Sequence, residues 1–317
     1  MTPWTWHGGG ITAARRHFGG DDWLDLSTGI NPVPWPGVDT LHFDWQALPA
    51  PEDLRALEAV AAAYFGVDPQ FVCAVPGTEI GLRLIGQSLN GVRTAHVAPS
   101  YRTHGEMVAG SIATQASRSD AAEALILANP NNPDGRLVDT ERLLAQDRPW
   151  LLVDEAFADP DPDCSVAAQV ADRSGLIVFR SFGKFFGLAG VRLGFVLARP
   201  EILADLRAVL GAWPLSAAAL AIGRAAYQDH AWIEQTRTRL WRQAAALDAV
   251  LEDCGFSAIG ACPLFRLITV DDGHALFERL ARRAILTRPF AEQPQWLRFG
   301  LPADTAGLER LRDALRG

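Results

Sequence analysis

The chain has 317 residues, of which 49% are hydrophobic and 21% charged. This composition is typical of a folded protein and excludes a mainly disordered chain, which needs low hydrophobicity and high net charge. Lys plus Arg number 29 against 37 Asp plus Glu, so the net charge is −8. General nucleic-acid binding requires a basic surface, so we expect no nucleic-acid partner. The length favours about two domains.

The sequence shows no sign of export or membrane insertion. The four cysteines lack C-x-x-C spacing, so they predict neither a metal site nor a disulfide scaffold, and a reducing compartment is the simplest interpretation. The N-terminus has no basic region followed by an apolar run, as a signal peptide would have. The longest uncharged stretch, 208–223, contains Gly211 and Pro214 and falls below the ~18 apolar residues that a spanning helix needs. We expect a cytoplasmic protein with a broken helix over 208–223 and no membrane contact.

The first 40 residues are rich in glycine, proline and tryptophan. Stretches such as 7–10 and 31–36 exclude long regular elements, so we expect residues 1–40 to form an arm that packs on another part of the protein. Apolar residues at helical spacing then predict a helix over about 52–65, with Gly66 as its stop.

An alternation typical of an α/β protein follows. Short apolar runs bounded by turn residues predict buried strands of a mostly parallel sheet, over 71–75, 94–97, 124–128, 150–153, 176–179 and 191–197, with a helix over about 78–89. The pattern is helical over about 201–251. The last third mixes strands (264–270, 296–299) with helices (275–283, 306–315), which is typical of an α+β domain. The sequence thus predicts an arm over 1–40, a large domain over 41–210 and a small domain over 211–317.

Lys184 stands in a glycine-rich loop directly after a predicted strand, and Arg192 follows eight residues later. A loop lysine desolvated by apolar neighbours, here Phe185 and Phe186, is suited to form a Schiff base. Ser181 and Arg192 are placed to bind a phosphate on the same cofactor. Taken alone, Lys184 would be interpreted as an ordinary surface lysine.

Asp154 ends a hydrophobic strand, at the sheet edge where ligands of α/β proteins collect. A carboxylate there can keep a pyridinium nitrogen protonated, which is the partner that pyridoxal phosphate needs as an electron sink. The alternative role for Asp154 is a helix N-cap.

Three other loops also follow predicted strands. The segment 129–135 carries two Asn-Pro steps, and an amide there can donate to a ring oxygen. Residues 76–79 open a helix whose free backbone N–H groups can cradle a phosphate. Tyr101 can stack on an aromatic cofactor. Each feature alone is also compatible with an ordinary turn or a packing tyrosine.

The order of these motifs resembles that of the class I/II aminotransferase family over nearly the whole chain. The resemblance implies the fold of the fold-type-I pyridoxal-phosphate enzymes, with pyridoxal 5'-phosphate as cofactor. It implies that Lys184 forms the Schiff base, Asp154 pairs with the pyridine nitrogen, Asn132 with the ring hydroxyl, and Tyr101 stacks on the ring. The residues implied to hold the phosphate are Gly77, Thr78, Glu79, Ser181 and Arg192.

The resemblance also concerns the substrate and the assembly. Arg298 is implied to bind the substrate α-carboxylate, for which a planar guanidinium is well suited. A homodimer is implied, because active sites of the family lie at a subunit interface. Phe157 and Leu48 stand where members of the family commonly carry tyrosines.

The N-terminal arm indicates which branch of the family the chain resembles. His7-Gly-Gly, followed by the segment 25–32, is similar to the opening of the threonine-phosphate decarboxylases of cobalamin biosynthesis, which are close to the histidinol-phosphate aminotransferases. This implies decarboxylation of L-threonine O-3-phosphate to (R)-1-amino-2-propanol O-2-phosphate. We expect His7, Asn31, Arg288 and Arg298 to bind this small phosphorylated amino acid, with Arg288 and His7 at its phosphate.

Two alternatives stay open at this point. The shared core motifs do not separate decarboxylation from transamination, because the bond that breaks depends on how the bound substrate is turned. A histidinol-phosphate aminotransferase or a related enzyme is therefore the first alternative. A non-catalytic protein that keeps the fold is the second, and the presence of Lys184, Asp154 and Arg192 argues against it.

Overall fold

The structure is a computed structural model that describes residues 3–115 and 121–317. The chain divides into two compact units. The small unit consists of Met1–Val33, Pro133–Arg136 and Thr236–Gly317, and the large unit of Pro34–Asn132 and Leu137–Gln235. The sequence-based division had its boundaries at residues 40 and 210, whereas the units change at 33/34 and 235/236.

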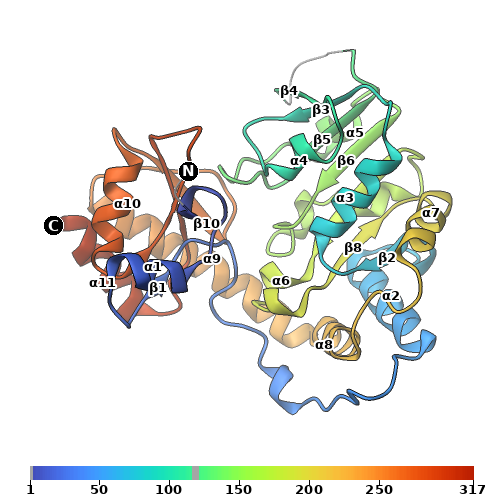
Figure 1. The fold of residues 1–317 in the computed structure, drawn as a ribbon, viewed down its shortest axis with the longest axis horizontal. Coiled ribbons are helices and arrows are strands. Elements are labelled where there is room, and N and C mark those ends of the chain that lie inside the picture. The colour runs from blue at the N-terminus through green and yellow to red at the C-terminus, as the bar shows by residue number, and fades with distance from the viewer. Residues whose placement is uncertain (1–2, 116–120) are drawn as a thin grey trace. The chain divides into compact units, whose positions relative to one another are not determined.

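Within the described residues, the large unit is built on a seven-stranded sheet of order β2-β8-β7-β6-β5-β3-β4 (Figure 1). Its neighbouring strands pair in parallel except β8, which runs antiparallel to both β2 and β7. The predicted mostly parallel α/β sheet is therefore confirmed. Its strands are β2 (Val72–Val75), β3 (Thr94–Val97), β4 (Ile112–Thr114), β5 (Ala124–Ala128), β6 (Trp150–Asp154), β7 (Leu176–Ser181) and β8 (Gly194–Leu197).

Helices cover the large sheet because its central strands are apolar on both faces. On one face, Leu82 and Ile85 of α3 and Leu203 and Leu206 of α7 join a buried cluster with residues of β2, β5, β6, β7 and β8. The helices of the large unit are α2 (Pro51–Phe65), α3 (Thr78–Ser88), α4 (Thr103–Glu106), α5 (Thr140–Leu144), α6 (Phe182–Phe185), α7 (Pro200–Leu210) and α8 (Ala217–Gln228). The long helix α9 (His230–Asp253) begins in the large unit and continues in the small unit.

Three local features differ from or refine the sequence-based expectations. The strand predicted from residue 191 begins only at Gly194, because Arg192 has a left-handed backbone (φ 57°) that interrupts an extended chain. The edge strand β4 was not predicted, since it is only three residues long and its Ile112 is exposed. The helix over 208–223 is broken as predicted: α7 ends at Leu210, and Ser216 caps α8 by accepting a hydrogen bond from the N–H of Ala219.

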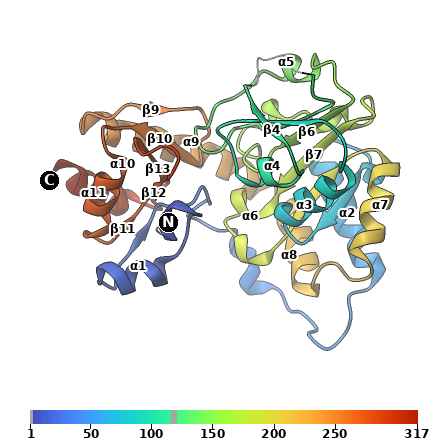
Figure 2. The same cartoon turned by 45° about the horizontal axis from the view of Figure 1, so that its top comes forward.

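Within the described residues, the small unit contains a four-stranded antiparallel sheet of order β12-β13-β10-β9 and a parallel pair, β1 with β11. Helices α10 and α11 lie beside this sheet (Figure 2). The elements are α1 (Ile11–Phe18), β1 (Leu24–Asp25), β9 (Ala258–Ile259), β10 (Phe265–Thr269), α10 (Gly273–Ala281), β11 (Ile285–Leu286), β12 (Arg288–Pro289), β13 (Trp296–Gly300) and α11 (Thr305–Arg316).

Backbone hydrogen bonds join the segment 24–26 to the rest of the small unit. Leu24 and Asp25 pair with Ile285 and Leu286, and the N–H of Gly300 donates to the carbonyl of Leu26 at 2.6 Å. Across both units, none of the described helices is long and apolar enough to cross a bilayer.

Candidate active site

A pocket of the large unit opens at the carboxyl ends of three parallel strands, and it holds about 740 Å³ of space, part of it open to solvent. The last residues of β5, β6 and β7, namely Ala128, Asp154 and Ser181, all line it. Parallel α/β sheets collect ligands at this edge. The lining includes eight of the residues predicted from the sequence to bind a cofactor: Thr78, Glu79, Tyr101, Asn132, Asp154, Ser181, Lys184 and Arg192.

Lys184 lies on α6, the short helix that follows β7 directly. Its Nζ is 5.6 Å from the centroid of the Phe157 ring, which also lines the pocket. On either side of the lysine the chain is anchored by aromatic packing, because Phe182 and Phe186 stack with centroids 4.5 Å apart and Phe185 is fully buried. The packing of α6 therefore holds the lysine backbone at the pocket wall.

Asp154 is part of a buried hydrogen-bonded chain. Its Oδ2 is 3.0 Å from Nε2 of His104, whose Nδ1 lies 3.2 Å from Oγ of Ser100. Its Oδ1 accepts the N–H of Ala156 at 3.1 Å. His104 is fully buried and Asp154 is 6% exposed. The carboxylate is thus fixed at both oxygens while it still lines the pocket.

A second end of the pocket is suited to an anion. Helix α3 begins at Thr78, and Thr78 and Glu79 of its first turn line the pocket, so the positive end of the helix dipole lies at this end. Gly77, just before it, has φ +89°, and a Cβ there would lie 2.6 Å from Nη2 of Arg192. A Cβ on Gly194 of β8 would lie 2.6 Å from the backbone nitrogen of Thr78. Two glycines therefore let a guanidinium and a strand approach the start of the helix closely.

Glu79 differs from its predicted neighbours in charge. Its carboxylate accepts hydrogen bonds from Arg83 Nε (2.9 Å), Tyr101 Oη (3.0 Å) and Thr103 Oγ1 (2.8 Å). Burial alone would raise the pKa of Glu79, but these bonds outweigh it and hold the pKa below its ordinary value. The side chain is therefore an occupied anion, and what Glu79 can offer a phosphate is its backbone N–H.

Of the asparagines in the 129–135 loop, Asn132 lines the pocket. The other two hold the loop in place. Asn129 donates from Nδ2 to the carbonyls of Val138 and Cys164 (both 3.1 Å), and Asn131 donates to the carbonyl of Pro99 (3.0 Å).

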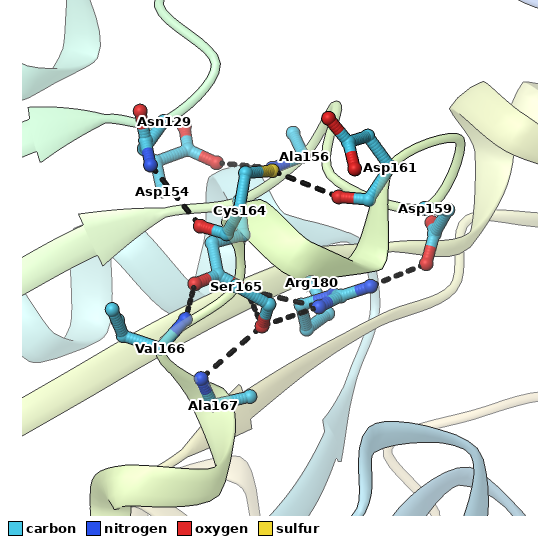
Figure 3. Close-up of polar contacts among 11 residues, drawn as sticks. Asn129, Asp154, Ala156, Asp159, Asp161, Cys164, Ser165, Val166, Ala167 and Arg180 are labelled. Carbon is cyan, nitrogen blue, oxygen red and sulfur yellow. Dashed lines mark hydrogen bonds and ion pairs between the residues drawn. The ribbon is translucent and has the colours of Figure 1, made fainter. Parts of the chain in front are cut away.

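Behind the pocket lies a buried charge cluster that the sequence did not reveal (Figure 3). Arg180 donates from Nη1 to Oε2 of Glu155 (2.9 Å) and to Oγ of Ser165 (3.0 Å), and from Nη2 to Asp159. Burial raises the pKa of Glu155, although the Arg180 charge acts in the opposite direction. Glu155 directly follows Asp154, and Arg180 directly precedes Ser181. The cluster thus ties the ends of β6 and β7 together.

The arginines predicted to bind the substrate face each other in the small unit. Arg288 of β12 is the register partner of Arg298 of β13, and both are at least 92% buried. Arg298 donates from Nη2 to the carbonyl of Ser27 (3.1 Å), and Arg288 donates to the carbonyls of Trp4 and Trp6. Burial and then the positive charge of Arg288 lower the pKa of Arg298. Like charges packed this closely favour the binding of an anion, which would offset their repulsion.

The other two predicted substrate residues, His7 and Asn31, also belong to the small unit. The exposed His7 lies edge-on to the Trp6 ring, with centroids 6.1 Å apart. Asn31 is buried, and its Oδ1 accepts the N–H of Val33 at 3.0 Å. The structure thus pairs Arg288 with Arg298 directly and places His7 and Asn31 in other contacts of the arm.

Comparison with known proteins decides the family. The family model "Aminotransferase class I and II" matches residues 83–315. The chain belongs to this family. It is 41% identical to a threonine-phosphate decarboxylase from a Sinorhizobium species and 39% identical to one from Pseudomonas aeruginosa, each match covering 98% of this chain and 97% of the relative.

Relatives that are not named threonine-phosphate decarboxylase are less similar in sequence to this chain. A histidinol-phosphate aminotransferase from Sodalis glossinidius is 27% identical over 89% of this chain and 85% of its own. The crystal structure of the Sinorhizobium meliloti histidinol-phosphate aminotransferase in complex with pyridoxal-5'-phosphate shares the fold, with a TM-score of 0.84 at 22% identity over 100% of this chain and 96% of that chain.

The pocket of this aminotransferase-family chain fits pyridoxal 5'-phosphate chemically. It offers an amine for an aldehyde (Lys184), a fixed carboxylate for a pyridine nitrogen (Asp154), and a helix start beside a guanidinium for a phosphate (Thr78 and Arg192). Sequence reasoning missed His104, Glu155 and Arg180. The one signal for each was position: His104 lies in α4, the short helix after β3, and the other two are next to Asp154 and Ser181.

Proposed function

We propose that the chain is a pyridoxal-phosphate-dependent decarboxylase that converts L-threonine O-3-phosphate to (R)-1-amino-2-propanol O-2-phosphate and carbon dioxide. The observation that carries the proposal is the 39–41% identity, over nearly the whole chain, to proteins named threonine-phosphate decarboxylase. The pocket supports it, because its lining holds the amine, the carboxylate and the anion end that such chemistry requires.

The residues that would hold the cofactor are those of the pocket. Gly77, Thr78, Glu79 (through its backbone N–H), Ser181 and Arg192 would bind its phosphate. Asp154 would pair with its ring nitrogen, Asn132 with its ring hydroxyl, and Tyr101 would lie against the ring. When bound, pyridoxal 5'-phosphate supplies an electron sink for the pair left by a bond broken at the substrate Cα.

The chain's own groups have defined tasks in this reaction. Lys184 would provide the amine that holds the cofactor covalently. Once the substrate amine has displaced it, the freed Lys184 ammonium would deliver a proton to Cα in place of the lost carboxyl group, so the product would keep its amino group. Asp154, held by His104, presents its carboxyl group to the pocket. His104 is fully buried and excludes water from behind the carboxylate, and its Nδ1 lies beside the hydroxyl of the half-buried Ser100.

We assign substrate recognition to the small unit. Arg298 would bind the carboxylate and Arg288, with His7, the phosphate, while Asn31 would also contact the substrate. Holding both anionic groups of one small molecule fixes its rotation, and this rotation decides which bond at Cα breaks. Binding energy from the remote phosphate would therefore be used to select the loss of carbon dioxide.

The first experiment is a product assay on the protein loaded with pyridoxal 5'-phosphate and given L-threonine O-3-phosphate. Carbon dioxide and pyridoxamine phosphate are measured in the same tube, with a Lys184→Ala variant as control. We expect carbon dioxide from the wild type, no pyridoxamine phosphate, and at least a 10²-fold lower rate, to order of magnitude, in the variant.

Two outcomes would overturn this function. Pyridoxamine phosphate without carbon dioxide would identify an aminotransferase, and histidinol phosphate would be the next substrate to test. A protein that takes up neither cofactor nor substrate would instead be a non-catalytic member of the family.

We also propose that the protein is a cytoplasmic homodimer. Exposed apolar side chains of the large unit, Trp45 (74%), Leu48 (66%) and Trp213 (55%), are available for a second copy. The four cysteines are free thiols, which suits a reducing compartment. Light scattering at micromolar concentration should give twice the 34.4 kDa chain mass; a single chain mass would contradict the dimer.

A further inference from the structure

We propose that Glu79 is a positioning residue that fixes the orientation of the Tyr101 ring in the pocket by accepting the tyrosine hydroxyl. The inference rests on the proposed binding of pyridoxal 5'-phosphate in that pocket. It assigns the Glu79 side chain a role that the sequence did not suggest, because sequence reasoning grouped Glu79 with the phosphate ligands.

The contacts of Glu79 are directed at the residues that follow β3. Oε2 accepts the Tyr101 hydroxyl at 3.0 Å and the Thr103 hydroxyl at 2.8 Å, while Oε1 accepts Arg83 Nε at 2.9 Å. Arg83 is itself held from the other side by Glu106 at 2.8 Å. Helix α3 and the segment after β3 are thereby joined through one carboxylate.

The charge of Glu79 argues against direct phosphate binding by its side chain. Its hydrogen bonds hold its pKa below the ordinary value despite the opposing effect of burial, so it is ionised at neutral pH. An ionised carboxylate can only accept hydrogen bonds and repels a phosphate. Arg83 offsets this charge at a distance of 2.9 Å, and the acid is therefore tolerated in the first turn of α3.

Tyr101 has the properties of a fixed donor. Burial and the nearby Glu79 charge raise the pKa of Tyr101 to about 12, so its hydroxyl keeps its proton and donates to the carboxylate. The ring meets His104 edge-on, with centroids 5.8 Å apart and planes at 84°. A hydrogen bond at the far end of the ring and an aromatic contact at its side together restrict both rotations of the side chain.

The contacts form one continuous path through the pocket wall. It runs from Glu79 in the first turn of α3 through Tyr101 to His104 and ends at Asp154. The two ends of this path are the anion end and the carboxylate of the pocket. Loss of the Glu79 acceptor should therefore loosen the Tyr101 ring without removing any group that contacts the reacting atoms.

The test compares five variants, four single and one double, with the wild type as full-length protein. Glu79→Ala removes the acceptor, Glu79→Gln keeps an acceptor oxygen but removes the charge, and Tyr101→Phe keeps the ring but removes the donor. Glu106→Gln is the matched control, because Glu106 shares Arg83 with Glu79 but makes its other ion pair with Arg102. The double variant Glu79→Ala/Tyr101→Phe completes a cycle.

The readouts are the dissociation constant of pyridoxal 5'-phosphate and the visible circular dichroism of the bound chromophore, which reports how its ring is held. We expect Glu79→Ala and Tyr101→Phe each to weaken binding about 3- to 10-fold, the range of one lost hydrogen bond, and to reduce the dichroism. The double variant should be no weaker than Glu79→Ala. Glu79→Gln should retain most of the affinity, and Glu106→Gln all of it.

Each contrary result has a distinct meaning. If Glu79→Gln behaves like Glu79→Ala, or if either variant tightens binding, the charge of Glu79 matters and the positioning role is wrong. Additive effects in the double variant would also overturn it, as would variants that match the Glu106→Gln control. If the wild type binds no cofactor, the proposed function fails instead. Thermal unfolding of the cofactor-free variants verifies that each is folded.

Discussion

Nε2 of His104 lies 3.0 Å from Oδ2 of Asp154, and neither residue is more than 6% exposed. Replacing His104 by Ala leaves a buried carboxylate oxygen without its donor. We expect a loss of about 1–3 kcal/mol in the free energy of unfolding and a fall in kcat of about tenfold or more. Ser100→Ala, which removes only the far hydrogen bond of the chain, should cost about 1 kcal/mol or less. Equal losses of stability and of kcat in the two variants would contradict the role of His104 as the donor that holds Asp154.

The Arg180 cluster predicts a stability effect. Arg180→Met would leave two buried carboxylates, Glu155 and Asp159, without their shared cation. The expected loss is about 3–5 kcal/mol in urea unfolding, since removing one partner of a buried ion pair is costly. Arg180→Lys keeps the charge and should lose less. A change below about 1 kcal/mol for Arg180→Met would contradict a stabilising role for this cluster.

Gly77 and Gly66 form a matched pair for testing the anion end. Both have positive φ (+89° and +71°), but a Cβ on Gly77 meets Arg192 Nη2 at 2.6 Å, whereas one on Gly66 meets nothing within 4 Å. Substitution by Ala should cost about 1–2 kcal/mol of stability at Gly66, which is left-handed helical, and more at Gly77, whose ψ of 148° puts it in a region almost restricted to glycine. Only Gly77→Ala should also weaken pyridoxal-phosphate binding, because the methyl group displaces the guanidinium. Similar affinities in both variants would remove Arg192 from the phosphate site.

The raised pKa of Tyr101 predicts its alkaline behaviour. Burial and the Glu79 charge raise this pKa to about 12, so the folded state holds the phenol proton above pH 10, where the unfolded chain releases it. The stability contribution of Tyr101 is therefore complete below pH 10 and is lost between about pH 10 and 12. Ultraviolet titrations of the wild type and Tyr101→Phe should overlay up to about pH 11. A separation near pH 10 would contradict the donor role of Tyr101.

Arg288 predicts a specific kinetic effect. Arg288→Ala should raise KM for L-threonine O-3-phosphate at least about tenfold, because a charge-assisted contact to the phosphate is lost. Arg288 also holds the carbonyls of Trp4 and Trp6, so Arg288→Lys is needed as a variant that keeps the charge. KM for unphosphorylated L-threonine should not change. An unchanged KM for the phosphorylated substrate would show that the assignment is wrong.

Much of the architecture was predictable because it depends on local patterns. Strands such as β3 and β5 begin and end at the predicted residues, since continuous apolar runs between turns are typical of buried parallel strands. The pocket lining was predictable because loops after parallel strands converge at one edge. The antiparallel direction of β8 was not predictable, because the residues of a strand do not indicate whether it runs parallel or antiparallel to its neighbours.

The residues behind the pocket were not predictable for a related reason. His104 acts on Asp154 across 50 positions of the chain, and Arg180 contacts Glu155 across 25. Such pairs follow from the register of neighbouring strands, and a single sequence carries no signal for them. The side-chain contacts of Glu79 could not be predicted for the same reason. Tyr101 and Thr103 follow β3 in the sequence and come within hydrogen-bond distance of Glu79 only when α3 and β3 are packed in the folded protein.

The antiparallel β8 has a practical consequence. Its first residue, Gly194, is the register partner of both Val75 and Ser181, and the missing Cβ leaves room for the backbone nitrogen of Thr78. The absence of a Cβ at Gly194 therefore sets how closely the start of α3 packs against the sheet. A library designed to change the substrate range should therefore keep residue 194 constant, because even a methyl group would move the start of α3 and alter every variant in the same way.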